Sequence, residues 1–203
     1  MTASNAIQQQ QFIAAALSEA ADALERLRAD DKKIAAVAKG AQLLIDAFNT
    51  SNRVFSCGNG GSMCDAMHFA EELSGRWRLN RRALGAMSMS DVSHMSCVAN
   101  DYGYDAVFSR FLEGNGRAGD VLVAISTSGT SKNILKACEA AKALNMRILS
   151  LTGREGSPIG GMADVDICTP GGAFADRTQE LHIKVIHILI ELTERALTPE
   201  NHQ

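Results

Sequence analysis

Five short apolar runs, separated by segments with helical spacing, constrain the fold of this chain most strongly. The runs are 54–57, 84–89, 121–125, 148–151 and 165–168. They lack a regular alternation of apolar and polar residues, as expected for strands that are buried on both faces. Helices are expected at about 64–73, 92–98, 105–112, 133–144 and 177–197. The pattern predicts an α/β fold: a three-layer, doubly wound, five-stranded parallel sheet with an N-terminal helical extension.

The first fifty residues show helical spacing, with a break near Asp30 and Asp31. Apolar positions in the first of these two helices are mostly alanine, so we expect it to pack against another subunit rather than within one domain. The predicted division is N-terminal helices for oligomer packing at 1–50, one domain at 51–197 and a tail at 198–203. A chain of 203 residues, 46% hydrophobic, can bury one sizeable core but not two.

Charge and cysteine content exclude several classes of function. A net charge of -3 gives no general attraction to nucleic acid or to an anionic membrane. The basic run 76–82 is the exception, and a solvated loop is its simplest explanation. The five scattered cysteines form no C-x-x-C pair, and neither a secretion signal nor an apolar run of ~20 residues is evident. We therefore expect a soluble cytoplasmic protein.

Polar segments follow the predicted strands at the edge of the sheet where ligands bind. The first, 58–62, is glycine-rich and would let backbone N–H groups approach an anion just before a helix. It is not a dinucleotide fingerprint, because Met63 stands where that motif needs glycine, and no Gly-Lys-Ser/Thr follows as in a Walker loop. Taken alone, a tight packing turn explains it equally well.

Two further segments offer groups that suit a sugar phosphate. Five hydroxyls in 126–131 lie just before a helix; one or two would suffice as caps, so we favour a phosphate site. The segment 99–103 is interpreted as a loop in which Asn100 and Asp101 could hold sugar hydroxyls. An Asx-turn is the simpler explanation for that loop.

One predicted helix carries an imidazole and two carboxylates on nearly the same face. His68 and Glu72 are four residues apart, as a metal pair or an acid/base pair requires. Glu71 is three residues from His68, and spacing alone cannot choose between the carboxylates. A surface pair without function is the commoner explanation for such a spacing.

The last predicted helix adds three candidates, Gln179, His182 and His187. His187 lies within the apolar stretch V-I-H-I-L-I, where an imidazole without a partner would be costly. A satisfied core histidine is the default interpretation, and a metal ligand or general acid is its competitor.

Four long motifs occur in an order that is typical of one known family. They are C-G-N-G-G-S-x-C-D-A-M-H-F-A-E-E-L, S-D-V-S-H-x-S-C-V-A-N-D, D-V-L-x-x-I-S-T-S-G-x-S and A-D-R-x-Q-E-x-H-I-K-V-I-H-I-L-I. From about residue 10 to 197 the chain resembles the bacterial phosphoheptose isomerases, members of the sugar isomerase (SIS) family. The resemblance implies a cytoplasmic homotetramer that converts sedoheptulose 7-phosphate to D-glycero-D-manno-heptose 7-phosphate. That reaction is the first step toward the nucleotide-activated heptose of the lipopolysaccharide core.

The resemblance also implies roles for individual residues. One zinc ion per subunit is implied, with ligands that fall on His68, Glu72, Gln179 and His187. Substrate contacts fall on Asn59, Gly60, Gly61, Asn100 and Asp101 for the sugar, on Ser62, Ser126, Thr127, Ser128 and Ser131 for the phosphate, and on Glu72 and Gln179. Arg76 and Asp176 match positions of the family's site region whose roles are less defined.

Aldose–ketose isomerisation needs a base, a second group that moves hydroxyl protons, and positive charge for a developing enediolate. The family pattern selects Glu72 as the base, with His187 as acid or second base and zinc as polariser. Gln179 and His187 are eight residues apart, ~12 Å along a helix, whereas zinc bonds are ~2.1 Å long. We therefore predict that at least one site residue crosses a subunit boundary.

Two other functions share the family's fold. One is a non-enzymatic tetramer that binds the bacterial replication initiator protein; it needs no base, and its positions equivalent to Glu72 and His187 do not carry Glu and His. The other is an isomerase for another sugar phosphate, such as an arabinose or hexulose phosphate. The zinc-type His-x-x-x-Glu, with Gln and His on the last helix, argues against both.

Overall fold

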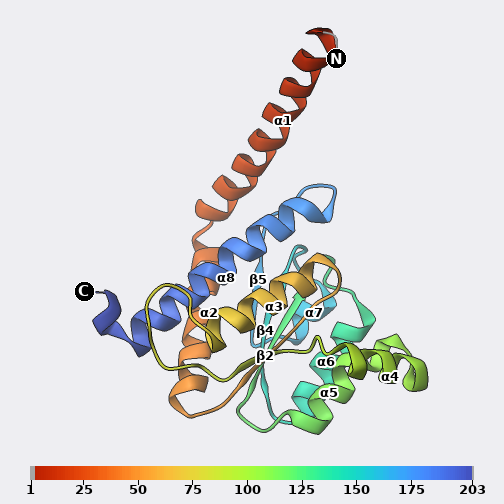
Figure 1. The fold of residues 1–203 in the computed structure, drawn as a ribbon, viewed down its shortest axis with the longest axis vertical. Coiled ribbons are helices and arrows are strands. Elements are labelled where there is room, and N and C mark those ends of the chain that lie inside the picture. Colours follow the sequence, from red (N-terminus) through yellow and green to blue (C-terminus); the bar gives the residue numbers. More distant parts are fainter. Residues whose placement is uncertain (1–2, 203) are drawn as a thin grey trace.

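A computed structural model describes residues 3–202, and it contains one parallel sheet between helices (Figure 1). The strands are β1 (Val54–Cys57), β2 (Ala86–Ser88), β3 (Val121–Ser126), β4 (Arg147–Thr152) and β5 (Val165–Cys168). The helices are α1 (Ala3–Arg28), α2 (Asp31–Asn49), α3 (Gly61–Ser74), α4 (Val92–Tyr102), η1 (Tyr104–Ala106), α5 (Val107–Asn115), α6 (Lys132–Ala143), α7 (Pro158–Met162), α8 (Ala175–Leu197) and η2 (Pro199–His202). The order β2-β1-β3-β4-β5, parallel throughout, confirms the predicted fold class.

Helices cover both faces of the sheet, so β1, β3 and most of β4 are buried on both sides, whereas the edge strands β2 and β5 are partly exposed. Along β3, Val121, Val123 and Ile125 face a core that is shared with α2, α3 and α8. The alternate residues Leu122 and Ala124 face a second core, with α4, α5, α6 and α7. This burial explains why the strands appear in the sequence as uninterrupted apolar runs.

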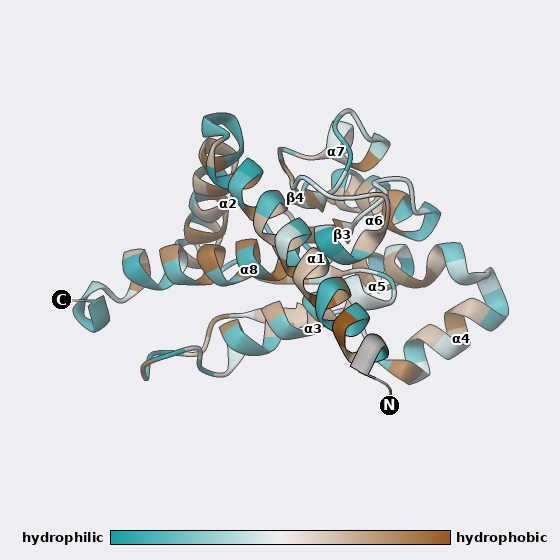
Figure 2. Cartoon of the chain, turned by 90° about the horizontal axis from the view of Figure 1, so that it is seen from above, coloured by the Kyte–Doolittle hydropathy of each residue, from teal (hydrophilic) through white to brown (hydrophobic). Residues whose placement is uncertain are grey.

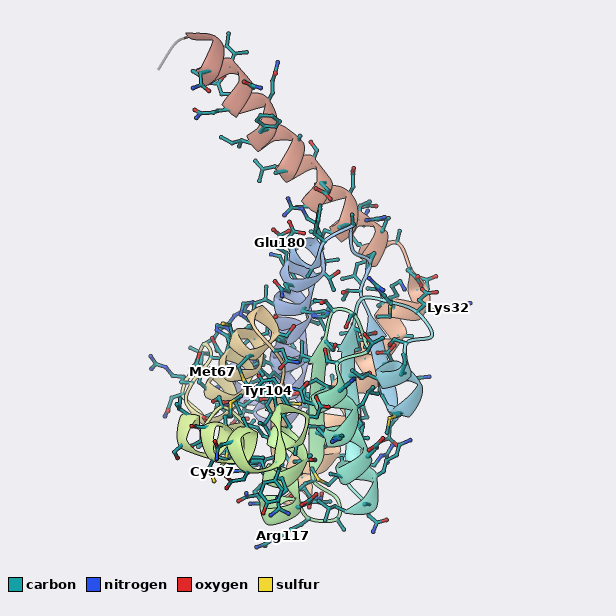
Figure 3. All side chains as sticks on the ribbon, turned by 90° about the vertical axis from the view of Figure 1, so that its right-hand side faces the viewer. Lys32, Met67, Cys97, Tyr104, Arg117 and Glu180 are labelled. Atoms are coloured by element: carbon teal, nitrogen blue, oxygen red, sulfur yellow. The ribbon has the colours of Figure 1, made fainter. Side chains whose placement is uncertain are left out.

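The helix α1 projects from the body of the molecule, and its side chains extend into open space (Figures 1 and 3). Only the end nearest α2 contributes to the core, through Ala23 and Leu27. Hydrophobic positions are interspersed with hydrophilic ones along the rest (Figure 2), where the exposed large apolar side chains are Ile7, Phe12, Ile13, Leu17 and Leu24. Within residues 3–202, no helix is long and apolar enough to cross a membrane.

The helix α2 behaves differently from α1. It begins after the N-cap Asp30, whose side chain accepts hydrogen bonds from two first-turn N–H groups. The break between the two helices therefore lies where it was predicted, near Asp30 and Asp31. Its buried face, which includes Leu44 and Phe48, packs into the same core as α8. The apolar stripe of α2 therefore covers the sheet of its own chain. The predicted division into N-terminal helices at 1–50, one domain at 51–197 and a tail at 198–203 stays a prediction.

Some expected element boundaries were also wrong. The segment 99–103 is not a loop, because α4 continues to Tyr102 and ends where Gly103 adopts a φ of 85°. The helix expected at 105–112 is divided into η1 and α5, and the strand expected at 84–89 is reduced to β2. The short helix α7 was missed; it starts at Pro158 after the N-cap Ser157.

Candidate active site

The turn between β1 and α3 depends on glycine in two ways. Gly60 has a φ of 55°, in the left-handed region that side chains disfavour. A Cβ on Gly58 would lie 2.3 Å from the backbone oxygen of Ser62, so the chain can fold back on itself only without a side chain there. The turn leads into the 14-residue helix α3, whose N-cap residue is Gly60. No side chain of residues 3–202 caps the first N–H groups of this helix.

The hydroxyl-rich segment 126–131 joins β3 to α6. Ser126 and Ser128 accept N–H groups within the loop, from Gly129 and Thr130. Ser131 is the N-cap residue, yet its hydroxyl caps no α6 N–H within the described chain and lies 3.2 Å from the Ser126 hydroxyl. Capping therefore does not account for Ser131. The Ile134 N–H of the first turn of α6 donates to Asn133 Oδ1, which leaves those of Lys132 and Asn133 for an anion.

A reciprocal pair of amides joins these two loops. Asn59 Nδ2 donates to Asn133 Oδ1 at 2.9 Å, and Asn133 Nδ2 donates to Asn59 Oδ1 at 2.8 Å. The Tyr104 hydroxyl donates to the same Asn59 oxygen at 3.2 Å. Sequence reasoning missed Asn133 and Tyr104, because nothing in the sequence pairs residues 74 and 45 positions apart. The Asn59 side chain, expected to contact the sugar, is thus engaged in fixing the turn.

Three of the four implied metal ligands converge from α3 and α8. His68, Glu72 and His187 each offer a ligand atom within 4.8 Å of the others. The Nε2 atoms of the two histidines are 3.0 Å apart, and His68 Nε2 is 3.4 Å from Glu72 Oε1. The cluster is partly buried, with 16% of the Glu72 side chain exposed. Residues more than a hundred positions apart in the sequence therefore form one group.

The structure distinguishes the two neighbouring carboxylates. Glu71 is 64% exposed and approaches the other imidazole nitrogen of His68, at 3.8 Å. Burial, with a smaller contribution from the Glu71 charge, raises the pKa of Glu72. A carboxylate whose pKa is raised holds a proton more readily, which suits a base that must return it.

The two histidines of α8 occupy different environments. His182 is completely buried, and its Nε2 lies 3.2 Å from the carbonyl oxygen of Thr152. His187 is only partly buried and faces His68. Burial, followed by nearby cationic groups, lowers the pKa of His187, so its imidazole is neutral at pH 7. The core histidine of this helix is therefore His182 rather than His187.

The cluster has the dimensions of a zinc site. Tetrahedral zinc with bonds of ~2.1 Å keeps its ligand atoms ~3.4 Å apart, close to the 3.0 and 3.4 Å of two of the three pairs; the third pair, Glu72 and His187, lies within 4.8 Å. In addition, Glu72 Oε2 is buried and finds no hydrogen-bond partner in residues 3–202. Imidazole and carboxylate are both zinc ligands, so the residues present fit this ion.

Gln179 meets the glycine turn at the start of α3. A Cβ on Gly61 would lie 2.7 Å from Gln179 Nε2, so the amide lies directly over the first residue of α3. Gly61 precedes His68 by seven residues, ~10 Å along the helix. Whether the fourth ligand or another site residue comes from a second subunit stays a prediction.

Four other implied site residues lie on the surface of the chain. Asn100 and Asp101 are exposed on α4, where the Asn100 amide donates to the Asp101 carboxylate at 2.7 Å. Asp176 is exposed in the first turn of α8 and accepts from the Arg177 backbone. Arg76 is exposed beyond the end of α3. Within one chain none of these four belongs to the imidazole–carboxylate cluster.

The fold and its loops define a class of protein. A family model described as the SIS domain matches residues 16–153, which include α2, the glycine turn and the hydroxyl-rich loop. The class is therefore that of SIS-domain proteins.

Individual relatives narrow the class. The chain is 55% identical over 188 residues to the phosphoheptose isomerase of Photorhabdus laumondii, covering 93% of this chain and 97% of that protein. It is 56% identical over 186 residues to the enzyme of the same name from Yersinia pestis, with coverage of 92% and 96%. The solved structure of a phosphoheptose isomerase from Neisseria gonorrhoeae superposes with a TM-score of 0.85 at 36% identity, over 92% of this chain and 98% of that one. This chain belongs to the phosphoheptose isomerase family.

Proposed function

We propose that this chain converts sedoheptulose 7-phosphate to D-glycero-D-manno-heptose 7-phosphate, as the family's name and the site both favour. The observation that carries the proposal is the partly buried group of His68, Glu72 and His187, two of which lie on the helix that begins at the glycine turn. The reaction supplies heptose for nucleotide-activated precursors of the lipopolysaccharide core.

The proposed chemistry moves two protons and leaves the phosphate untouched. Glu72 takes the proton from C1 of the ketose, which gives a cis-enediol, and returns that proton to C2. His187, neutral at pH 7, carries the hydroxyl proton from O1 to O2, so that the new carbonyl forms at C1. Of the two Glu72 oxygens, Oε1 faces His68 and Oε2 is buried without a partner in the described chain.

The substrate's phosphate is proposed to bind at the loop 126–131 and Ser62. Hydroxyls of Ser126, Thr127, Ser128 and Ser131 are the expected donors, together with the first turn of α6. The glycine turn 59–61 is proposed to contact the sugar through its backbone.

Zinc is the proposed cofactor, held by His68, Glu72 and His187, with Gln179 as a fourth ligand. A bound zinc ion supplies positive charge that stabilises an enediolate. The four ligands are a proposal, and the fit of the three converging side chains supports it.

We further propose a cytoplasmic homotetramer with active sites at subunit interfaces. The exposed apolar side chains of α1, including Phe12 and Leu17, support assembly through this helix. The exposure of Asn100 and Asp101 is compatible with a role toward a neighbouring subunit's site.

Turnover of sedoheptulose 7-phosphate by wild type and by Glu72→Gln tests the proposal. The wild type should form the heptose, and the variant, which keeps its shape but lacks a base, should lose at least a hundredfold in kcat. Equal turnover by both would remove the proposed mechanism. A folded, zinc-loaded wild type without turnover would instead favour the non-enzymatic alternative, to which the comparisons give no support.

A further inference from the structure

One arginine of the basic run 76–82 points into the protein. The Arg81 side chain is 1% exposed, and so is that of Glu194 on α8; Arg81 Nε lies 2.6 Å from Glu194 Oε1. Arg76, Arg78 and Arg82 of the same run are exposed. The run is therefore a solvated loop with a single buried ion pair, which the function described above does not use.

Arg81 binds the C-terminal end of α3 through its guanidinium group. Nη2 donates to the carbonyl oxygen of Glu72 at 2.7 Å, and Nη1 donates to that of Leu73 at 2.8 Å and approaches that of Gly75 at 3.2 Å. Carbonyl groups in the last turn of a helix have no partner within the helix, and positive charge is favourable there. Arg81 thus satisfies the turn that carries the proposed base.

Glu194 ties this turn to the helix on the other side of the site. It follows His187 by seven residues on α8, two turns along the same face. Its bond to Arg81 therefore joins the end of α3, which holds His68 and Glu72, to the helix that holds His187. The Arg81–Glu194 ion pair lies one to two helical turns beyond the imidazole–carboxylate cluster.

We propose that the Arg81–Glu194 pair is a positioning pair, which holds Glu72 and His68 of α3 in register with His187 of α8. The proposal rests on the proposed function for its kinetic readout. Arg81 acts through the Glu72 backbone and is not a catalytic residue. This role requires the several N–H donors of a guanidinium group, because they bind the Glu194 carboxylate and the Glu72 and Leu73 carbonyls in fixed directions. The single ammonium group of a lysine cannot do so.

A double variant separates positioning from simple stabilisation. Breaking one half of a buried ion pair leaves an unpaired charge, whereas replacing both halves by apolar side chains of similar volume is often neutral for folding. We therefore compare wild type with Arg81→Met combined with Glu194→Leu. The double variant should unfold cooperatively near the wild-type midpoint. Its kcat should fall roughly 10–100-fold with KM unchanged, and its affinity for Zn²⁺, measured by chelator competition, should fall by a similar factor.

Two further substitutions serve as controls. Arg53→Met breaks another partly buried pair, with Asp120, at the starts of β1 and β3, and should lower stability without changing kcat or Zn²⁺ affinity. Arg82→Met removes an exposed neighbour in the same run and should change neither. Arg81→Lys keeps the positive charge opposite Glu194 but loses the guanidinium donors, and it should lower kcat in a folded protein. This variant tests the positioning role if the double variant does not fold.

A folded double variant, or a folded Arg81→Lys, that keeps wild-type kcat and Zn²⁺ affinity would overturn the positioning role. A raised KM with unchanged kcat would overturn it as well, because the pair would then act on substrate binding. Zn²⁺ affinity is read without substrate, so this inference can fail while turnover of the heptulose phosphate stands. A wild type without turnover would defeat the proposed function and leave the Zn²⁺ comparison to decide the role of Arg81.

Discussion

The buried His182 should make the stability of this protein fall in mild acid. Burial lowers the pKa of His182 to about 4, from an ordinary value of 6.5, because the charged imidazolium is disfavoured inside the protein. Its Nδ1 is buried and has no hydrogen-bond partner in residues 3–202, so a second proton there would find no acceptor. The folded protein therefore keeps this side chain neutral at a pH at which the unfolded chain protonates it.

The sign and size of the effect follow from proton linkage. Between pH 6.5 and about 4 the unfolded state binds more protons than the folded state, so the free energy of unfolding decreases as the pH falls. With these two pKa values, the His182 contribution between pH 7 and pH 5 is a loss of about 2 kcal/mol. Below pH 4 the loss levels off at about 3 kcal/mol.

Urea unfolding of wild type and His182→Gln at pH 7 and pH 5 measures this contribution. Glutamine does not titrate and can still donate to the Thr152 carbonyl, and every other titrating group is common to both proteins. The wild type should lose about 2 kcal/mol more than the variant between the two pH values. Both proteins are compared at one concentration, because assembly adds to apparent stability. The same pH dependence in both proteins would show that His182 is not the neutral core histidine described here.

Three other substitutions test the loops and α1. Ser131→Ala should raise KM for the sugar phosphate severalfold with little change in kcat, because the proposed role of this hydroxyl is to bind the phosphate and it caps no α6 N–H in the described chain. An unchanged KM in steady-state kinetics would show that Ser131 does not belong to the phosphate site. Gly129→Ala should cost about 2 kcal/mol in urea unfolding, because φ is 66° and the new Cβ would lie 2.3 Å from Ser157 Cβ; a wild-type midpoint would contradict this. Leu17→Asp should give a smaller, still helical species by light scattering and circular dichroism, and an unchanged mass would argue against assembly through α1.

Local patterns in the sequence were sufficient for the sheet and for the chemistry of the loops. Strands buried on both faces are mostly apolar, so β1, β3 and β4 could be recognised from short runs alone. Glycines at 58 and 60 and hydroxyls between 126 and 131 mark turns whose backbone demands are local. The end of α4 was misjudged, because Asn100 and Asp101 favour turns, while the helix stops only at Gly103.

Which polar side chains meet was decided by the tertiary structure. His187 has the more apolar neighbours in the sequence, yet His182 is the one buried against Thr152, while His187 faces His68. The packing of α8 on the sheet and on α3 sets which face of the helix points inward. The partners of Asn59 and Arg81 lie 74 and 113 residues away, and no local pattern pairs them. The sequence by itself determined the layers, the loops and, through its motifs, the family. The cluster of His68, Glu72 and His187, and the ion pair beside it, exist only because α3 and α8, distant in the sequence, pack against each other on one face of the sheet.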